Sequence, residues 1–206
     1  VAAIGNFNDM DGDAKGAKDL WWTAGGSIKP FVPALLEGQQ LVVDALFGTG
    51  LDRPVEGAAK SAIDAIGASR LPVVAVDIPS GINADNGSIM GAAVRATHTV
   101  TFVRPKTGHV LMPGKGYTGE LHVYDIGISG DGVTPGYFLN APPLWQHLFP
   151  FPAPEAHKYS RGHALIMGSG MSATGATRLA AVAALRAGAG LVSVACPQDS
   201  LPIYAM

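Results

Sequence analysis

Two segments of the sequence end an apolar run in an aspartate and then continue into small residues. "VVDALFGTG" contains Asp44, and "VVAVDIPSG" contains Asp77, which is followed three residues later by Ser80. Ligands of open parallel sheets bind outside the carboxyl ends of the strands, so two acids at two such ends would face one crevice. Because an ionised carboxylate taken out of water is costly without a partner, each acid needs an ion, a ligand or a structural donor.

A shared cation is one candidate partner for these acids. Carboxylate, hydroxyl and carbonyl oxygens are hard ligands, so Asp44, Ser80 and nearby carbonyl groups could hold one ion together. The alternative is that Asp44 and Asp77 cap a helix or a loop. The occurrence of the same pattern in two segments favours the ligand site.

The turn after Asp44 has the composition of an anion site. Gly48, Thr49 and Gly50 offer unhindered backbone N–H groups for a phosphate or carboxylate, and Arg53 adds a charge-assisted partner. The segment is not a P-loop, because no Gly-Lys-Ser/Thr follows, and it is not a G-x-G-x-x-G fingerprint. A plain tight turn before a helix would use the same residues, so both interpretations stay open.

The remaining acids, histidines and cations predict no further site. Around Asp9, Asp11 and Asp13, neither the glycine nor the closing glutamate of a calcium loop has the required spacing, so this stretch is interpreted as a solvated turn and helix cap. The histidines form no i,i+4 pair, and none is assigned to a metal: His98, His109, His122, His147, His157 and His163. Three cations are interpreted as surface charge, the more common case: Arg104, Lys106 and Lys115.

Composition and charge limit the class of protein. The 206 residues are 48% apolar and 15% charged, as in a soluble α/β protein of one to two domains. The net charge of -2 gives no general attraction to nucleic acid or to an anionic membrane, so neither is expected as a partner. The single cysteine, Cys196, is interpreted as a buried strand residue, and the absence of a leader or a long apolar span predicts a cytoplasmic protein.

Continuous apolar runs predict strands that are covered on both faces of a mainly parallel sheet. These runs are residues 41–47, 71–78, 99–103, 121–124, 164–167 and 191–195. Helices are predicted over residues 13–22, 56–68 and 173–187. In the first helix, Asp13 is the expected N-cap, and Trp21 and Trp22 are the expected core anchors. The predicted fold class is α/β, with a mainly parallel three-layer sheet.

A segment rich in proline, glycine and aromatic residues separates two regions. Residues 129–156 are predicted to be a linker, or an arm that packs on a neighbour through aromatic side chains: Phe138, Trp145, Phe149 and Phe151. Residues 1–128 form the first predicted domain. Residues 157–206 begin a second α/β unit, a βαβ unit whose glycines fit either a ligand at the helix N-terminus or a tight turn.

Several segments together resemble the NAD(P)H-hydrate epimerase family. They are "VVDALFGTGLDRPV", "VAVDIPSGINADNG", "ATHTVTFVRPKTGHV" and "GELHVYDIGI". "HKYSRGHALIMGSG" and "TGATRLAAVAALRAGAGLVSVA" resemble the start of the ADP-dependent NAD(P)H-hydrate dehydratase domain. The order is that of the bifunctional NAD(P)H-hydrate repair enzymes, and the resemblance covers nearly all of the chain outside residues 129–156.

The resemblance implies a Rossmann-like first domain that binds potassium (K+) at Asp44 and Ser80. The implied substrate is a small dinucleotide, NADH or NADPH hydrated on its nicotinamide ring, whose R and S forms the domain would interconvert as an isomerase. Asp77 is expected to be catalytic, and the contacts expected for the hydrated cofactor are Gly48, Thr49, Gly50, Leu51, Asp52, Arg53, Pro54 and Asp77. A homo-oligomer is a further expectation.

For residues 157–206 the resemblance implies the first βαβ unit of a ribokinase-like domain. That domain would be a lyase that uses ADP or ATP to dehydrate the S hydrate. Only Gly175 and Ala176 match its binding site within this sequence.

Two departures and two alternatives accompany the resemblance. The asparagine- and glycine-rich loop of the family should precede Val1, and both ends of the sequence read as truncated, so the chain is expected to be incapable of either full reaction. "FNDMDGDAKGAKDLWW" matches the family only loosely. The alternatives are a non-catalytic, epimerase-like dimerisation scaffold, and a sugar or vitamin kinase, which leaves residues 41–128 unexplained.

Overall fold

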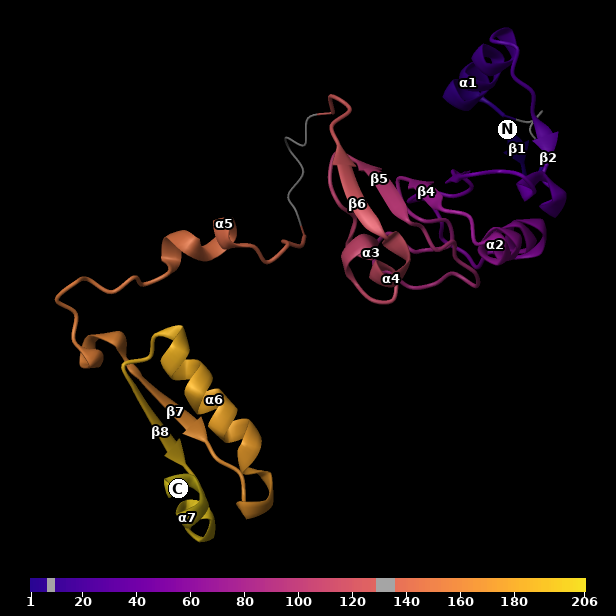
Figure 1. Ribbon diagram of the computed structural model, residues 1–206. Helices are drawn as coiled ribbons and strands as arrows, with labels where there is room; N and C mark the ends of the chain where they lie inside the picture. The colour runs from indigo at the N-terminus through magenta and orange to yellow at the C-terminus, as the bar shows by residue number, and fades with distance from the viewer. Residues whose placement is uncertain (7–9, 129–135) are drawn as a thin grey trace. The chain divides into compact units, whose positions relative to one another are not determined.

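The computed structural model describes residues 1–6, 10–128 and 136–206 (Figure 1). The chain divides into two compact units, Val1–Phe138 and Leu139–Met206, and each is described by itself. Residues 129–135, which are part of the predicted linker 129–156, and the acid Asp9 lie outside the described residues.

A four-stranded parallel sheet is the centre of the first unit. Its strands lie in the order β3 (Val42–Asp44), β4 (Val73–Val76), β5 (His98–Phe102) and β6 (Glu120–Tyr124). Parallel neighbours need a crossover connection, and α2 (Gly57–Ser69) supplies it between β3 and β4. The predicted parallel α/β class is therefore confirmed. Strands β3 and β4 are shorter than their apolar runs, whereas β5 and β6 match theirs to within one residue at each end.

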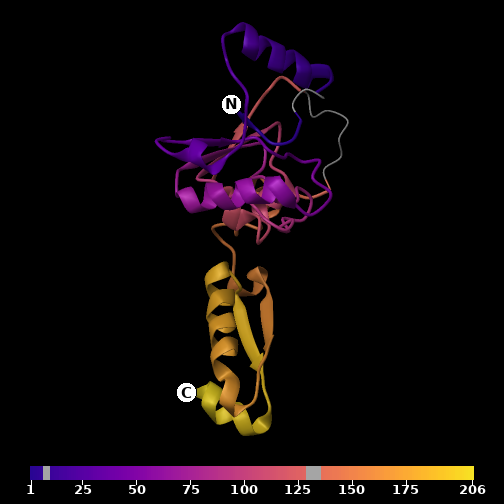
Figure 2. The same cartoon turned by 90° about the vertical axis from the view of Figure 1, so that its right-hand side faces the viewer.

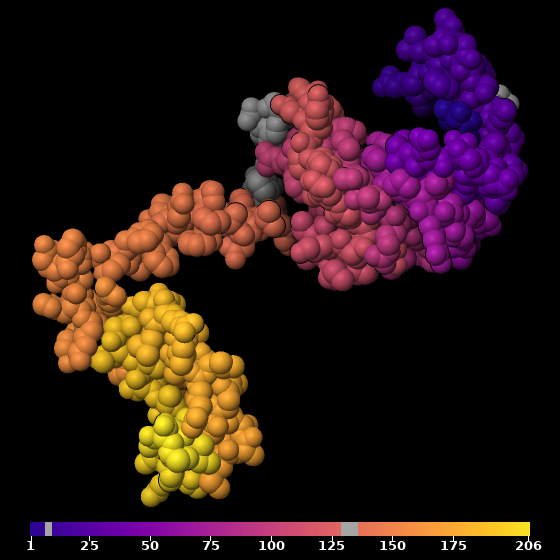
Figure 3. Space-filling model, viewed as in Figure 1, coloured from indigo at the N-terminus to yellow at the C-terminus, as the bar shows by residue number. Residues whose placement is uncertain are grey.

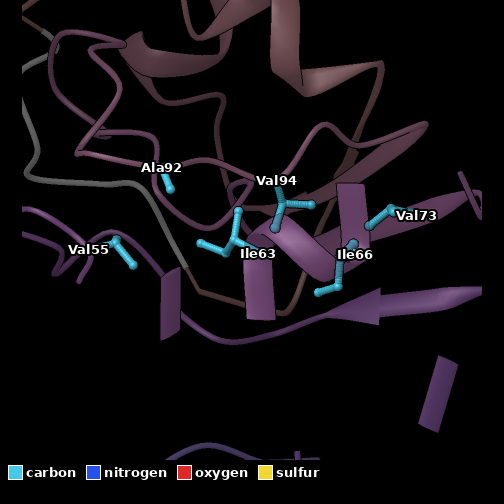
Figure 4. Close-up of a cluster of buried hydrophobic side chains, with 6 residues drawn as sticks. All are labelled: Val55, Ile63, Ile66, Val73, Ala92 and Val94. Atoms are coloured by element: carbon cyan, nitrogen blue, oxygen red, sulfur yellow. The ribbon is translucent and has the colours of Figure 1, made fainter. Parts of the chain in front are cut away.

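Helix α2 covers one face of this sheet and forms the main core. Ile63 and Ile66 lie three residues apart on one face of the helix and pack toward Val73 (Figure 4). Val55, which precedes α2, and Ala92 and Val94, from the connection between β4 and β5, complete the same buried cluster. Burial of each such side chain stabilises the fold by about 1.5–3 kcal/mol, so this cluster fixes β3 and β4 beside each other.

The opposite face of the sheet is open in the described chain. Side chains alternate between the two faces of a strand, and the register places Val43, His98 and Glu120 on one face. Val43 is 63% exposed and Tyr124 is 64% exposed. Within the described residues the sheet thus has a covered face and an accessible one.

The connections after β4 and β5 lie at the carboxyl ends of the strands. Residues 77–97 join β4 to β5 through a loop in which Ile82 pairs with Ile89. Gly81 in this loop has φ +93°, and a side chain there would meet the Ala92 carbonyl oxygen. Two short helices, α3 (Thr107–Val110) and α4 (Lys115–Thr118), join β5 to β6.

The N-terminal part of the first unit contains three further elements and a short turn. They are β1 (Ala2–Ala3), α1 (Gly12–Thr23), β2 (Lys29–Pro30) and the 3-10 turn η2 (Pro33–Leu36), with β1 and β2 parallel.

Two predictions for α1 are wrong. The N-cap is Asp11 rather than Asp13, which lies in the first turn. Trp21 and Trp22 are 42% and 43% exposed, so neither is a core anchor. Trp21 lies against Gly26 of the following turn, and Trp22 lies against the Lys18 ammonium.

The second unit is a βαβ unit preceded by an aromatic segment. Its strands β7 (His163–Met167) and β8 (Leu191–Ala195) are parallel, and α6 (Thr174–Ala187) connects them and runs alongside both (Figure 2). The shorter elements are α5 (Pro142–Trp145), η3 (Gln146–Leu148), η4 (Lys158–Arg161), η5 (Met171–Ala173), η6 (Gln198–Ser200) and α7 (Leu201–Ala205). No helix in the described part of the chain is long and apolar enough to cross a membrane.

Residues 139–156 of the second unit form a narrow stretch (Figure 3). Phe149 contacts Trp145 and Phe151, with ring centroids 6.2 and 4.9 Å apart, so three of the predicted arm aromatics pack on one another. Cys196 follows β8 directly and is half-buried, so its interpretation as a buried strand residue is wrong. β8 pairs with β7 alone in the described unit, and this small sheet leaves its strand ends partly exposed.

Candidate functional site

Asp44 and Ser80 form a buried hydrogen-bonded pair at the carboxyl ends of β3 and β4. Asp44 is the last residue of β3, and both residues are at most 1% exposed. The Ser80 hydroxyl donates to Asp44 Oδ1 at 2.6 Å, and the Ser80 backbone N–H donates to Oδ2 at 2.8 Å. The structure therefore brings together the two residues expected to share an ion, and the serine is also a structural donor to the acid.

The surroundings of Asp44 suit a cation. Burial raises the pKa of Asp44, and the hydrogen bonds from Ser80 and Leu46 only partly oppose this. Among the described residues, no lysine, arginine or histidine forms an ion pair with this carboxylate. The Phe47 carbonyl oxygen lies 3.3 Å from Ser80 Oγ, so carboxylate, hydroxyl and carbonyl oxygens are gathered at one place.

Asp77 follows β4 in a left-handed backbone conformation, with φ +69°. Its backbone N–H donates to the Val100 carbonyl of β5 at 2.7 Å. Its side-chain Oδ1 accepts hydrogen bonds from the Thr101 hydroxyl at 2.9 Å and from the Lys106 ammonium at 2.5 Å. In the described chain, every hydrogen bond to this carboxylate uses Oδ1.

The Lys106 ammonium keeps Asp77 ionised. Burial raises the pKa of Asp77, but the hydrogen bonds from Lys106 and Thr101 and the positive charge of Lys106 outweigh burial and lower the pKa overall. The Asp77 and Lys106 side chains retain 21% and 23% exposure, so the pair borders solvent. Asp77 is thus an anion that a ligand can reach.

His109 is a neutral ring that forms a hydrogen bond with the backbone of Asp77. His109 Nδ1 accepts from the Lys106 backbone N–H at 2.9 Å, so its Nε2 carries the proton and donates to the Asp77 carbonyl oxygen at 2.8 Å. The ring is 2% exposed, and burial lowers the pKa of His109. A neutral His109 therefore fixes the backbone of Asp77 without adding a charge.

This histidine should make stability depend on pH. Below the ordinary value of 6.5 the unfolded chain binds a proton that folded His109 rejects, so the free energy of unfolding should rise with pH up to about that value. One proton limits the slope to about 1.4 kcal/mol per pH unit. Urea unfolding of wild type and His109→Gln over about pH 5 to 8 should show a smaller slope in the variant. An unchanged slope in His109→Gln, with the exposed His147→Gln as control, would contradict the assignment.

The loop between β3 and α2 carries the remaining candidates of the first unit. A side chain at Gly48 would lie 4.0 Å from Asp77 Oδ2, so this glycine leaves that oxygen accessible. Leu51 is half-buried against the core, whereas the other predicted contacts are exposed: Gly48, Thr49, Gly50, Asp52, Arg53 and Pro54. The loop therefore meets the acid at Gly48 and presents its polar groups to solvent.

A hollow of about 910 Å³ lies between the N-terminal residues and β3, and Asp44 is part of its wall. Its wall includes β1, β3 and the residues Asp44, Leu46 and Phe47. Asp77 does not line this hollow. The two acids therefore lie at the ends of neighbouring strands, but only Asp44 borders this hollow.

Three residues of the Asp77 cluster were missed by the sequence analysis: Thr101, Lys106 and His109. The interpretation of Lys106 as surface charge is wrong, because its ammonium contacts Asp77, Thr101 and the Phe102 carbonyl. A lysine and a histidine three residues apart after a strand were the available signal. Gly175 and Ala176 lie exposed in the first turn of α6 in the second unit.

Comparison with known proteins adds independent findings. The family model described as YjeF-related protein N-terminus matches residues 1–108. A bifunctional NAD(P)H-hydrate repair enzyme Nnr of Coxiella burnetii is 39% identical over 207 residues, which is 98% of this chain and 42% of that protein. An NAD(P)H-hydrate epimerase of Limosilactobacillus fermentum is 54% identical over 93 residues, 45% of each chain. The chain spans about two fifths of the length of the bifunctional relatives that it matches throughout.

A solved structure gives a weaker likeness. A crystal structure of a yeast protein covers 57% of this chain and 50% of its own, with 18% identity and a TM-score of 0.47.

Proposed function

The chain belongs to the family of the YjeF-related protein N-terminus, and we propose that its first unit is part of the epimerase domain of a protein that interconverts the R and S forms of hydrated NADH and NADPH. The assignment covers residues 1–128, with 129–156 as a linker and 157–206 as the start of an ADP-dependent dehydratase domain. Similarity to proteins named as NAD(P)H-hydrate epimerases and bifunctional repair enzymes supports it. The observation that carries it is the ionised Asp77 beside Gly48, at the carboxyl end of a parallel strand.

The substrate would be a nicotinamide ring to which water has added, leaving a hydroxyl group on carbon 6. Interconversion of the R and S forms requires this hydroxyl to leave and return, or the ring to open. Departure of the hydroxyl leaves a positively charged ring, and an anion held in place next to the ring would stabilise that charge, whereas ring opening needs a base to take the hydroxyl proton.

Asp77 is the residue we assign to this task. Its lowered pKa keeps it anionic, which suits a base and a charge stabiliser better than a proton donor. Oδ1 is held by Lys106 and Thr101, so Oδ2, beside Gly48, is the oxygen directed to the substrate. Lys106 is a positioning residue in this scheme, because it holds the charge and orientation of Asp77.

The loop 48–54 would bind the dinucleotide, with backbone N–H groups at Gly48 to Gly50 and the charge of Arg53 for phosphate. Asp44 and Ser80 would hold potassium, and the Phe47 carbonyl is a further oxygen donor nearby. A bound potassium ion would supply positive charge next to the anionic substrate. Asp44 itself would then be neutralised without a proton.

The second unit would contribute part of a nucleotide site. Gly175 and Ala176 lie at the N-terminus of the 14-residue helix α6, where free backbone N–H groups favour a phosphate of ADP or ATP. Phosphorylation of the S hydroxyl would then allow its departure as phosphate.

The proposal is tested by following one stereoisomer. The open reading frame that contains residues 1–206 is expressed, purified and incubated with R hydrate of NADPH, and the R and S forms are separated by chromatography. We expect S hydrate to appear far above the rate of a boiled sample, because typical general acid–base assistance alone gives about 10²–10⁴-fold. A rate equal to that of the boiled sample, from a protein that still binds NADP, would favour a non-catalytic scaffold instead.

A further inference from the structure

A cluster of two histidines and a glutamate lies outside the site described above. His98 is the first residue of β5, Glu120 is the first residue of β6, and His122 is two residues further along β6. His98 and Glu120 are register partners in neighbouring parallel strands, so all three side chains project from the open face of the sheet. This cluster is at the amino ends of the strands, whereas Asp77 is at a carboxyl end.

The two imidazole nitrogens lie close to each other, and each lies close to a different oxygen of the Glu120 carboxylate. His98 Nδ1 lies 3.2 Å from His122 Nε2 and 3.5 Å from Glu120 Oε2, and His122 Nε2 lies 3.7 Å from Glu120 Oε1. Zinc binds imidazole nitrogen and carboxylate oxygen at about 2.0–2.2 Å, which in a tetrahedron separates the ligand atoms by about 3.3–3.5 Å. One carboxylate oxygen and the two nitrogens all lie within 4.8 Å of one another, so small side-chain rotations would bring them to the spacing of three corners of a zinc site.

Hydrogen bonding alone explains only the short distance between His98 and His122. The two imidazole nitrogens at 3.2 Å can share one proton, but the two distances to the carboxylate exceed the usual range of about 2.7–3.2 Å. Two rings and a carboxylate converge at a spacing that suits an ion placed between them. The side chains are 44–67% exposed, so an ion can enter.

We propose that His98, Glu120 and His122 form a three-ligand zinc site on the open face of the sheet. Two nitrogens and one carboxylate oxygen are a common donor set for Zn²⁺, and water would take the fourth position. The ion would join β5 to the edge strand β6. One ion per chain is the expected stoichiometry, since the three ligands come from one chain.

The test uses residues 1–206 without an affinity tag, after removal of metal by a chelator. Titration calorimetry with Zn²⁺ should give one high-affinity ion per chain, and Co²⁺ should give the intense visible absorption of a tetrahedral site. His98→Ala, His122→Ala and Glu120→Gln should each weaken Zn²⁺ binding by more than the roughly 10–100-fold that loss of an outer-shell partner costs.

Controls separate this site from other binding. His147→Ala removes an exposed histidine of the second unit and should leave the affinity unchanged. Glu120→Gln keeps the size of the side chain, so its circular dichroism spectrum should match that of wild type. A loss of Zn²⁺ affinity in this variant then shows that the Glu120 carboxylate is a ligand of the ion. The proposal is overturned if the His98→Ala/His122→Ala double variant binds Zn²⁺ as tightly as wild type. It is also overturned if wild type binds half an ion per chain, which would indicate a site shared between copies.

Discussion

Replacement of Asp77 by asparagine is expected to lower the rate of hydrate epimerisation by about 10²–10⁴-fold, the usual contribution of a positioned acid–base group. The amide keeps the size of the carboxylate and its contact with Thr101, but it removes the negative charge that Lys106 stabilises. Binding of the substrate should change far less than turnover, because the loop 48–54 is untouched. The measurement is the initial rate of R-to-S conversion in the open reading frame that contains residues 1–206.

Two further variants make this result specific. Asp85→Asn removes an exposed acid of the following loop and should retain the wild-type rate. Lys106→Met should raise the pKa of Asp77, since it removes the charge that lowers it, and the rate should then fall at acidic pH and recover as pH rises. If Asp77→Asn kept more than half of the wild-type rate, the catalytic assignment of Asp77 would be abandoned.

Removal of the Asp44 carboxylate should destabilise the first unit by about 1–3 kcal/mol. In Asp44→Ala the Ser80 backbone N–H loses its acceptor inside the protein, and each buried group left without a partner costs about 1–3 kcal/mol. Urea unfolding at neutral pH measures the change. Asp64→Ala is the matched control, since Asp64 pairs with Lys60 at the surface and such a pair contributes only about 0.3–0.5 kcal/mol.

The pH dependence and potassium give a second readout for Asp44. Its folded pKa is raised, so above the ordinary value of 3.8 the unfolded chain releases a proton that the folded chain retains. Stability should therefore fall as pH rises from 3.8 through the folded pKa, and Asp44→Ala should lack this decline. Potassium should reduce the decline in wild type, by about 2.7 kcal/mol at 100 times its dissociation constant, relative to sodium at equal ionic strength. Equal stability in both salts would count against a potassium site at Asp44 and Ser80.

The sequence predicted the strands of the two larger parallel pairings and the three long helices, because their patterns are local. Continuous apolar runs found all the strands of the four-stranded sheet and both strands of the second unit. The helix predicted over 173–187 differs from α6 by one residue. The two tryptophans of α1 were misassigned, since hydrophobicity indicates a tendency to be buried but not whether a neighbouring element is there to bury against.

The site was only partly predictable, because its contacts depend on strand pairing. Asp44 and Ser80 were found from the shared pattern of two segments. Lys106 was not, since it reaches Asp77 from 29 positions away and only because β5 lies beside β4. The histidines were searched for helical spacing along the chain, whereas His98 and His122 meet across two strands.

The backbone of Asp77 is held on both sides, by the Val100 carbonyl at its N–H and by the His109 ring at its C=O. A non-glycine residue in the left-handed region costs about 1–3 kcal/mol, so its neighbours must impose this geometry. The direction of the carboxylate is therefore set by the fold before any substrate arrives. Under the proposed function, such preorganisation would place an anion beside the bound ring before charge develops on it, with little rearrangement needed during the reaction.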